Sequence, residues 1–319
     1  PLLRDPAVRE AIDLAVDRQD IIGGTLGGFA QETTGPFVPG TWAYDPSVAA
    51  DSSGNAMAVW QHEGEVWARR YDVTLGWEVS PTQLSNSPRG VFTPKIVVDG
   101  NDVFTVVWIE DSDPINSGLP GGGPNHASPY ARRYASGSWQ TSSQRIGWPG
   151  SDFLGQFDGA GRFWVDNNAA GDVFVVWEQG RTLADNSHEY SVGTARFDAG
   201  AGTWSGPATI TAHTGYLSWP QVALDNSGNA LAVWYKDEST GSSARGSWFN
   251  TSTGTWSAPE LLDQTGTGDV SDIVVAMDGN GNAEVAWYET GKGMIERRYN
   301  ATAGTIYAEG LSGDRPTRS

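Results

Sequence analysis

The sequence predicts an all-β protein built from a repeated unit of short strands, and three observations lead to this prediction. Glycine makes up 41 of the 319 residues, nearly twice its usual share of roughly 7%. Tryptophan is also abundant, with 15 residues. Many glycines together with many aromatic residues are typical of short strands joined by tight turns. The third observation is a motif, apolar–Asp–x–x–Gly–Asn–x–x–x–Val–Trp, which recurs along the chain.

The motif has two close copies and three looser ones, which end at Trp60, Trp234, Trp108, Trp177 and Trp287. In four copies the Asp stands nine positions before the Trp. In the third copy we assign this role to Asp166, eleven positions before its Trp, so that this turn gains two residues. The pattern predicts a turn between two strands, because Asp bonds to the backbone ahead of it and Gly or Asn accepts a positive φ. A calcium ion in such a turn would find too few oxygen ligands.

A second strand-like segment follows each copy and ends in an aromatic residue, and a last short strand begins a few residues later. Each unit thus contains four short strands over roughly 45–60 residues, which is the signature of a propeller blade. We therefore predict a five-bladed β-propeller of four-stranded blades, closed by packing of the fifth blade against the first. The predicted propeller domain is 45–311, with a tail at 312–319 and blades at about 45–88, 92–147, 160–211, 217–263 and 270–310.

The Pro-x-Val-Ala-x-Asp-x-x-Gly-Asn opening of the units resembles propeller repeats of bacterial secreted proteins of the NHL and sialidase-like kind. The resemblance covers nearly all of residues 45–310 and implies the architecture. It implies no single activity, because propellers serve as lectins, hydrolases, lyases and scaffolds. The arginine triad and the Ser-x-Asp-x-Gly-x-x-Trp boxes of a true sialidase are not found in the sequence.

Residues 1–44 do not follow the repeat, and we predict a short helical segment and a linker there. Asp5 suits a helix N-cap and Pro6 the first helical position. The run DPAVREAIDLAVDRQDII resembles a helix of the family 5 solute-binding proteins, the peptide-, nickel- and sugar-binding subunits of ABC importers. This resemblance covers about residues 1–46 and does not include the two lobes of that family's cleft, so we carry over no transport function.

The chain is strongly acidic, with a net charge of −18, which argues against a nucleic acid partner because an acidic surface repels phosphates. No apolar run approaches the ~18 residues that a membrane span requires. Cysteine is absent and the four histidines lack metal-binding spacing, so we expect neither a metal nor a cofactor. No signal peptide is visible after Pro1, yet the repeat is typical of secreted or periplasmic proteins. The oligomeric state is left open.

An acid follows the second strand of every unit, beside the loops that differ most between units. If the units close radially, these acids surround the mouth of a central channel. A protonated and an ionised carboxyl group in that place could hydrolyse a glycosidic bond. The preferred pair is Glu110 or Asp111 with Glu178, and Asp272 and Glu289 of the last unit are further catalytic candidates. The alternative is that these acids are solvated loop ends.

Other side chains expected on the same face suit a sugar ligand. Lys95, Arg162 and Gln221 lie close to the apolar cores of first strands, and Arg181 lies in a long loop. Trp148 and Trp219 come from connections between units, where an indole can stack on the apolar face of a sugar ring. The alternative for both indoles is packing between blades.

Taken together, these residues favour a carbohydrate-active protein, with a glycoside hydrolase as the preferred hypothesis because the loops and acids differ from unit to unit. A lectin would repeat the same aromatic and polar set in each gap between blades, and it remains an alternative. A non-catalytic scaffold for protein interactions is the third hypothesis.

Overall fold

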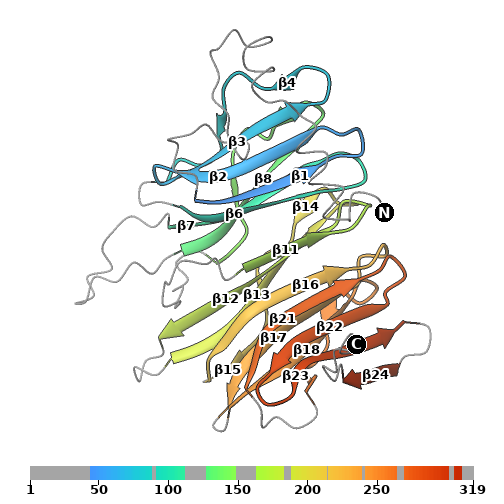
Figure 1. Cartoon of the computed structure of the whole chain (residues 1–319). Helices are drawn as coiled ribbons and strands as arrows, with labels where there is room; N and C mark the ends of the chain where they lie inside the picture. The colour runs from blue at the N-terminus through green and yellow to red at the C-terminus, as the bar shows by residue number, and fades with distance from the viewer. Residues whose placement is uncertain are drawn as a thin grey trace, which may run out of the picture. The chain divides into compact units, whose positions relative to one another are not determined.

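The computed structural model describes residues 44–87, 91–111, 127–148, 163–182, 188–213, 215–238, 241–263, 269–301 and 305–310. All the elements in these segments are strands, and they form five antiparallel sheets that follow one another along the chain (Figure 1). The prediction of an all-β fold with five four-stranded blades is therefore confirmed. The predicted N-terminal helical segment and the tail lie outside the described residues.

Each sheet is a meander, and in the first four sheets the fourth strand consists of two short fragments on the third strand. Sheet 1 contains β1 (Tyr44–Ala50), β2 (Ala56–His62), β3 (Glu65–Asp72), β4 (Gly76–Trp77) and β5 (Thr82–Gln83). Sheet 2 contains β6 (Val91–Val98), β7 (Phe104–Asp111), β8 (Ala127–Ala135), β9 (Ser138–Trp139) and β10 (Gln144–Arg145). Sheet 3 contains β11 (Phe163–Asn167), β12 (Val173–Thr182), β13 (His188–Asp198), β14 (Thr203–Trp204) and β15 (Ala208–His213).

The last two sheets repeat the same plan. Sheet 4 contains β16 (Leu217–Leu224), β17 (Ala230–Glu238), β18 (Gly241–Asn250), β19 (Thr255–Trp256) and β20 (Glu260–Leu261). Sheet 5 contains β21 (Val270–Met277), β22 (Ala283–Glu289), β23 (Gly293–Asn300) and β24 (Thr305–Gly310).

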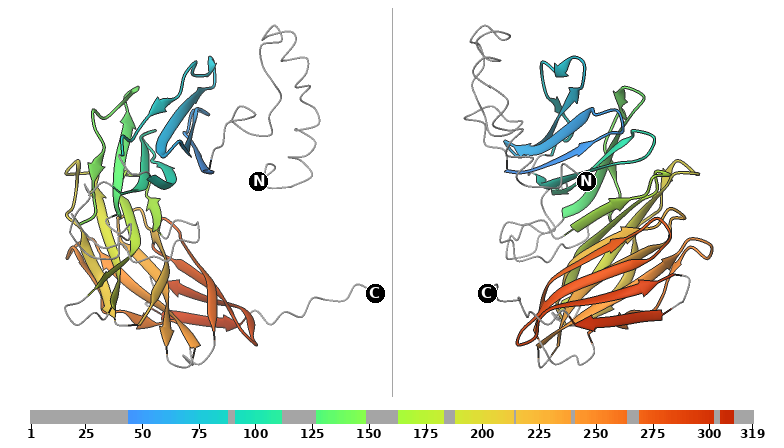
Figure 2. Two further views of the ribbon diagram at one scale, coloured as in Figure 1. Left: turned by 90° about the vertical axis from the view of Figure 1, so that its left-hand side faces the viewer. Right: turned by 45° about the vertical axis from the view of Figure 1, so that its right-hand side comes forward.

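Consecutive sheets pack face to face, and the first strand of each sheet lies beside the first strand of the next (Figure 2). Successive side chains of a strand point to opposite faces of its sheet. In β7, Phe104, Val106 and Trp108 belong to the cluster shared with sheet 1, whereas Val107 belongs to the cluster shared with sheet 3. We call the face toward the preceding sheet the front face and the face toward the following sheet the back face.

The tryptophans that end the repeated motif form the centres of these junctions. Trp108, Trp177, Trp234 and Trp287 are each at most 1% exposed and pack from a front face onto the preceding sheet. Because both faces of a middle sheet are buried, its second strand is apolar at nearly every position, as in Val-Phe-Val-Val-Trp of β12. The repeat is therefore a packing unit, as the sequence predicts.

The predicted closure of the ring is not part of the described structure. Packing between strands of neighbouring sheets occurs at the four junctions between consecutive sheets. Among the described strands, those of sheet 1 and sheet 5 make no comparable contact.

The turn between the first two strands is held by its Asp side chain, as predicted. In sheet 4, Asp225 Oδ1 accepts hydrogen bonds from the backbone N–H groups of Ser227 and Asn229, both at 2.8 Å. Gly228 in this turn has a φ of +78°, which L-residues with a side chain rarely adopt. The side chain thus satisfies backbone donors that the turn leaves without a strand partner.

The third turn differs from the prediction. The role assigned to Asp166 belongs to Asn168, which stands nine positions before its Trp and whose Oδ1 accepts the backbone N–H of Asp172 at 3.0 Å. This turn therefore gains no residues, and the assignment to Asp166 is wrong. Asp166 Oδ2 instead accepts the backbone N–H of Leu224 in sheet 4 at 3.1 Å. The sequence pattern misleads here because Asn can replace Asp as the acceptor.

We expect Asp225→Ala to lower the free energy of unfolding by about 1–3 kcal/mol, because it leaves two N–H groups of a half-buried turn without their acceptor. Urea unfolding of the variant and the parent measures the difference. Val79→Ala is the control, since Val79 is 96% exposed and its truncation should change stability little. Equal stability of parent and Asp225→Ala would contradict the role given to this side chain.

Candidate functional site

A bulge interrupts the first strand of four sheets near its beginning. The pairing register shifts between Tyr44 and Ser47, Phe92 and Lys95, Ser218 and Gln221, and Ser271 and Val274. Within three of these bulges a residue other than glycine has a positive φ, namely Thr93, Trp219 and Asp272. Bulges re-aim side chains and are common beside functional sites. Here the bulges lie at the same end of the sheets as the acids of the second strands.

Glu110 is a buried carboxyl group near the end of β7. Its Oε2 accepts a hydrogen bond from Trp108 Nε1 at 3.0 Å, and the residue is 6% exposed. Burial raises the pKa of Glu110, and the charge of Glu65 raises it further, whereas the Trp108 hydrogen bond and the charge of Arg145 lower it. Desolvation is the largest of these effects, so the environment favours the protonated acid.

Three further polar side chains complete this group, which we call the Glu110 cluster (Glu65, Trp108, Glu110, Tyr130 and Arg145). Glu65 accepts hydrogen bonds from the Ser85 hydroxyl and, at 3.0 Å, from the backbone N–H of Ser87. Arg145 Nε donates to the Tyr130 hydroxyl at 3.0 Å, and the Tyr130 ring stacks on Trp108 with centroids 6.3 Å apart. A buried carboxyl group with a raised pKa thus interacts with a second carboxyl group that accepts hydrogen bonds from a hydroxyl and a backbone N–H.

Glu178 on β12 has a different environment. It is 4% exposed and accepts hydrogen bonds from the Ser218 hydroxyl and, at 2.8 Å, from the backbone N–H of Trp219. Both donors belong to the bulge of the next sheet. Burial raises the pKa of nearby Tyr235, and the charge of Glu178 adds to this effect. Glu178 therefore joins sheet 3 to the strained start of sheet 4.

The preferred pair from the sequence, Glu110 and Glu178, does not share a gap between sheets. Glu110 follows its Trp by two positions and shares the front face with it, whereas Glu178 follows Trp177 by one position and points to the back. The counterpart of Glu110 in sheet 3 is Gln179, whose Oε1 accepts from Trp177 Nε1 at 3.0 Å. Because the side-chain period of a strand is two, one residue of offset moves an acid to the opposite face.

Of the other predicted acids, Glu289 and Asp272 belong to sheet 5, whereas Asp111 follows Glu110 on β7. Glu289 is 3% exposed and its Oε1 lies 2.5 Å from Lys292 Nζ. Asp272 is exposed at the bulge of β21, and its Oδ2 accepts from the Ser271 hydroxyl at 3.0 Å. Asp111 ends β7 opposite Ala127, and its side chain lies outside the described part of the chain.

Of the predicted aromatic ligands, Trp148 and Trp219 differ. Trp148 packs against Trp177 with ring centroids 5.7 Å apart and belongs to the cluster between sheets 2 and 3, so it has the packing role. Trp219 is 50% exposed at a φ of +55°. A bulky residue at positive φ is a strained outlier, and this one presents its indole to solvent.

The predicted polar ligands are scattered over several sheets. Lys95 Nζ lies 4.7 Å from the ring centre of Trp164, in a cation–π contact between sheets 2 and 3. Gln221 is half-buried on β16 opposite Val233. Arg181 lies on β12 opposite Glu189, with a side chain outside the described residues, and Arg162 lies outside them altogether.

Within the described segments, no three His, Cys, Asp or Glu side chains are grouped in a way that could hold a metal ion. No helix that could cross a membrane is found among the described residues either.

No family model matches the chain, and no curated protein matches it. The resemblance of residues 1–46 to solute-binding proteins is therefore unsupported. Solved structures do match. A protein of unknown function from Dyadobacter fermentans is 14% identical with a TM-score of 0.52, covering 85% of this chain and 83% of that one.

Two polysaccharide lyases are also similar. The lyase Uly1 is 12% identical with a TM-score of 0.51, covering 90% of this chain and 75% of its own. An ulvan lyase from a new polysaccharide lyase family, bound to a GlcA(1-4)Rha3S saccharide, is 12% identical with a TM-score of 0.50, covering 84% and 72%. At this identity the likeness shows the fold, which is one that carbohydrate-active enzymes use.

The raised pKa of Glu110 has a consequence for stability. The folded protein binds the Glu110 proton more tightly than the unfolded chain does, so stability is lost as pH rises through the elevated pKa. We expect Glu110→Gln to be at least as stable as the parent at about pH 7.5, and the advantage to shrink toward about pH 4. Thermal unfolding at both pH values measures this, with Glu284→Gln, an exposed glutamate, as control. A variant less stable than the parent at the higher pH would contradict the pKa direction.

Proposed function

We propose that the protein is a glycoside hydrolase, with Glu110 as the general acid and Glu65 as the second carboxyl group. The observation that carries the proposal is that two carboxyl groups from neighbouring sheets interact in one gap and have different surroundings. Desolvation raises the pKa of Glu110, whereas Glu65 accepts hydrogen bonds from the Ser85 hydroxyl and the Ser87 N–H. A glycosidase needs one carboxyl group that gives a proton and a second that acts as base or nucleophile.

The proposed reaction moves one proton to the leaving group and takes one from water. Glu110 gives its proton to the glycosidic oxygen as the bond from that oxygen to the anomeric carbon breaks. Glu65 then either accepts a proton from the attacking water or forms a covalent bond to the anomeric carbon that water later cleaves. Tyr130 and Arg145 supply a hydroxyl and a guanidinium beside the carboxyl groups, suited to sugar hydroxyl or carboxylate groups.

Glu178 has another role in this proposal. Its Oε1 already accepts two hydrogen bonds from the bulge of sheet 4, so it holds Trp219 in place rather than acting on substrate. Asp111 adjoins Glu110 at the end of β7, but as the next residue of the strand it belongs to the opposite face, so we give it no part in this gap. We place the substrate among polysaccharides, as in the two similar lyases, and the protein in a secreted or periplasmic location.

A lectin is the second candidate, and the exposure of Trp219 favours it. The indole is half exposed, and the hydroxyl of the preceding Ser218 donates to the Tyr216 hydroxyl at 3.4 Å. The Tyr216 ring in turn lies 5.2 Å from that of Tyr190. Stacking aromatics with nearby hydroxyl groups can hold a sugar without any chemistry.

We expect Glu110→Gln and Glu65→Gln each to lower kcat by ~10²-fold or more, because each removes one of two carboxyl groups that the reaction needs. A panel of aryl-glycosides and polysaccharides, followed by reducing-end assays, identifies the substrate and measures the rates. Glu284→Gln should keep the parent rate, since Glu284 is exposed on sheet 5. Near-normal rates in both cluster variants would refute the assignment. An unsaturated sugar product would replace hydrolysis with elimination.

For Trp219→Ala we expect sugar binding to weaken roughly tenfold, with Trp219→Phe retaining most of it, because stacking needs an aromatic face. Titration of oligosaccharides against intrinsic fluorescence gives the dissociation constants. Trp164→Ala is the matched control, since this indole is also exposed, at 37%. Binding that survives in Glu110→Gln but fails in Trp219→Ala, without cleavage by the parent, would establish the lectin.

A further inference from the structure

The indole N–H of Trp287 differs from those of the corresponding tryptophans in two other sheets. Trp108 Nε1 donates to Glu110 Oε2 and Trp177 Nε1 donates to Gln179 Oε1, both at 3.0 Å. In each case the acceptor stands two positions after the tryptophan and shares its face of the sheet. Trp287 is 1% exposed, and its Nε1 has no hydrogen-bond partner among the described residues. A buried donor without an acceptor is unfavourable and rare.

The residue in the acceptor position of sheet 5 is Glu289, and it has another partner. Glu289 stands two positions after Trp287 at the end of β22 and is 3% exposed. Its Oε1 lies 2.5 Å from the ammonium nitrogen of Lys292, which follows β22 in a turn and has a side chain 48% exposed. Because the indole N–H groups of sheets 2 and 3 point to this position, Trp287 Nε1 is aimed at the end of the gap where both charges lie.

Two further carboxyl groups lie at the same end of the gap between sheets 4 and 5. The Ser242 hydroxyl donates to the backbone oxygen of Val270 at 2.9 Å and accepts its N–H at 2.7 Å, which joins the two sheets. Asp237 lies opposite Ser242 on sheet 4, Asp269 precedes Val270 on sheet 5, and Val270 pairs with Glu289. Partial burial raises the pKa of Asp237, and the charge of Asp269 raises it further. Both aspartates reach solvent and form the rim of this end of the gap.

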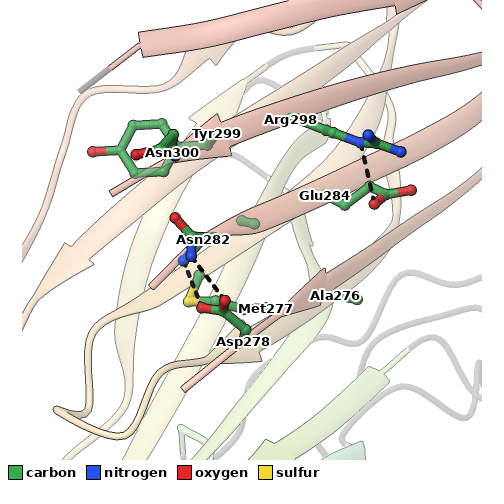
Figure 3. Close-up of a pocket in the computed structure, with 9 residues that line it drawn as sticks. Ala276, Met277, Asp278, Asn282, Glu284, Arg298, Tyr299 and Asn300 are labelled. Carbon is green, nitrogen blue, oxygen red and sulfur yellow. Dashed lines mark hydrogen bonds and ion pairs between the residues drawn. The ribbon is translucent and has the colours of Figure 1, made fainter. Parts of the chain in front are cut away.

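The polar groups in a hollow elsewhere on sheet 5 pair with one another instead. This hollow of about 530 Å³ lies at the opposite end of the sheet, beside the turn between β21 and β22 (Figure 3). Asn282 Nδ2 donates to Asp278 Oδ2 at 2.8 Å, and Arg298 Nε lies 3.5 Å from Glu284 Oε2. The hollow therefore offers no acceptor to the buried indole N–H at the other end.

We propose that this end of the gap between sheets 4 and 5 is a second ligand site, which binds an uncharged saccharide. Hydroxyl groups of the saccharide donate to the Asp237 and Asp269 carboxylates and accept from the Lys292 ammonium. Glu289, no longer paired with Lys292, then accepts the Trp287 N–H, as the corresponding acid does in sheet 2. The site lies in a different gap from the Glu110 cluster, and binding there does not depend on the proposed hydrolysis.

The groups at the site favour this class of ligand over a charged one. A hydroxyl group both donates and accepts hydrogen bonds, so it suits carboxylates that stand beside an ammonium. Three carboxylates (Asp237, Asp269 and Glu289) and one ammonium (Lys292) give a local charge of 1 − 3, or −2, which repels an acidic saccharide. An organic cation brings donors only and leaves Lys292 without a new acceptor. No three acids or histidines among the described residues are grouped to hold a metal ion.

Lys292→Met tests whether Glu289 exchanges one partner for the other. Without the ammonium, we expect Glu289 to accept the Trp287 N–H, so that the indole proton resonance of this tryptophan moves downfield. Lys292→Arg keeps a cation beside Glu289 and should leave the resonance close to its position in the parent. Trp287→Phe identifies the resonance among those of the 15 tryptophans. An unchanged resonance in Lys292→Met would overturn the exchange.

Titration of saccharides tests the site itself, with the Trp287 resonance followed in Glu110→Gln so that cleavage at the other gap does not interfere. Cellohexaose and xylohexaose are the uncharged probes, hexagalacturonate is the acidic probe and spermidine is the cationic one. We expect an uncharged probe to move the resonance in the same direction as Lys292→Met does, and the acidic and cationic probes to leave it in place. A response to a charged probe alone would overturn the ligand class, and no response to any probe would overturn the site.

Variants at the rim separate this site from the one proposed for hydrolysis. Asp237→Ala and Asp269→Ala should each weaken binding of the uncharged probe about tenfold, because each removes a charged acceptor of a ligand hydroxyl group. Glu284→Gln, at an exposed carboxylate of sheet 5, should bind as the parent does. Undiminished binding in both rim variants would contradict the site. Cleavage by the parent without any response at Trp287 would refute this site and leave the hydrolase, whereas a response at Trp287 without cleavage would do the reverse.

Discussion

The burial of one tryptophan per sheet against the back of the preceding sheet is the interaction on which the rest of the structure depends. Trp108, Trp177, Trp234 and Trp287 are each almost fully buried, and each requires a complementary apolar back face before it in space. This requirement makes both faces of a middle sheet apolar. The buried acids Glu110 and Glu289 accordingly lie at or next to the ends of their strands.

The same constraint decides which acids can act together. A carboxyl group two residues after its Trp shares a gap with the preceding sheet, as Glu110 does with Glu65. A carboxyl group one residue after belongs to the next gap, as Glu178 does with Ser218. The polar groups that can react together in such a fold are therefore those in one gap between two sheets. Neighbouring gaps contain different polar groups, although the strands repeat.

The repeat made the strands, the five units and the turns predictable, because a motif that recurs with fixed spacing reports packing that also recurs. The candidate site was predictable in part. Glu110 was predicted because it is an acid near the end of an apolar strand, but its partner Glu65 was not. The tight turn at Glu63 and Gly64, both at positive φ, places the start of β3, and so Glu65, at the same end of the sheet. The sequence did not show that Glu110 and Glu65 share a gap. Residues share a gap only if each lies on the correct face of its own strand, and this face changes with every residue.

Other differences between prediction and structure have two causes. One residue type can replace another in the same role, and a residue outside the motif can still pack between the repeated sheets. Asn168 accepts the turn hydrogen bond that Asp accepts in other units, so a pattern that requires an acid predicts Asp166 instead. Trp148 comes from a variable connection yet packs on Trp177, because a large ring near a gap is drawn into it. Trp219 does not pack in this way: its backbone N–H donates to Glu178 in a bulge where its φ is +55°, and its side chain stays half exposed.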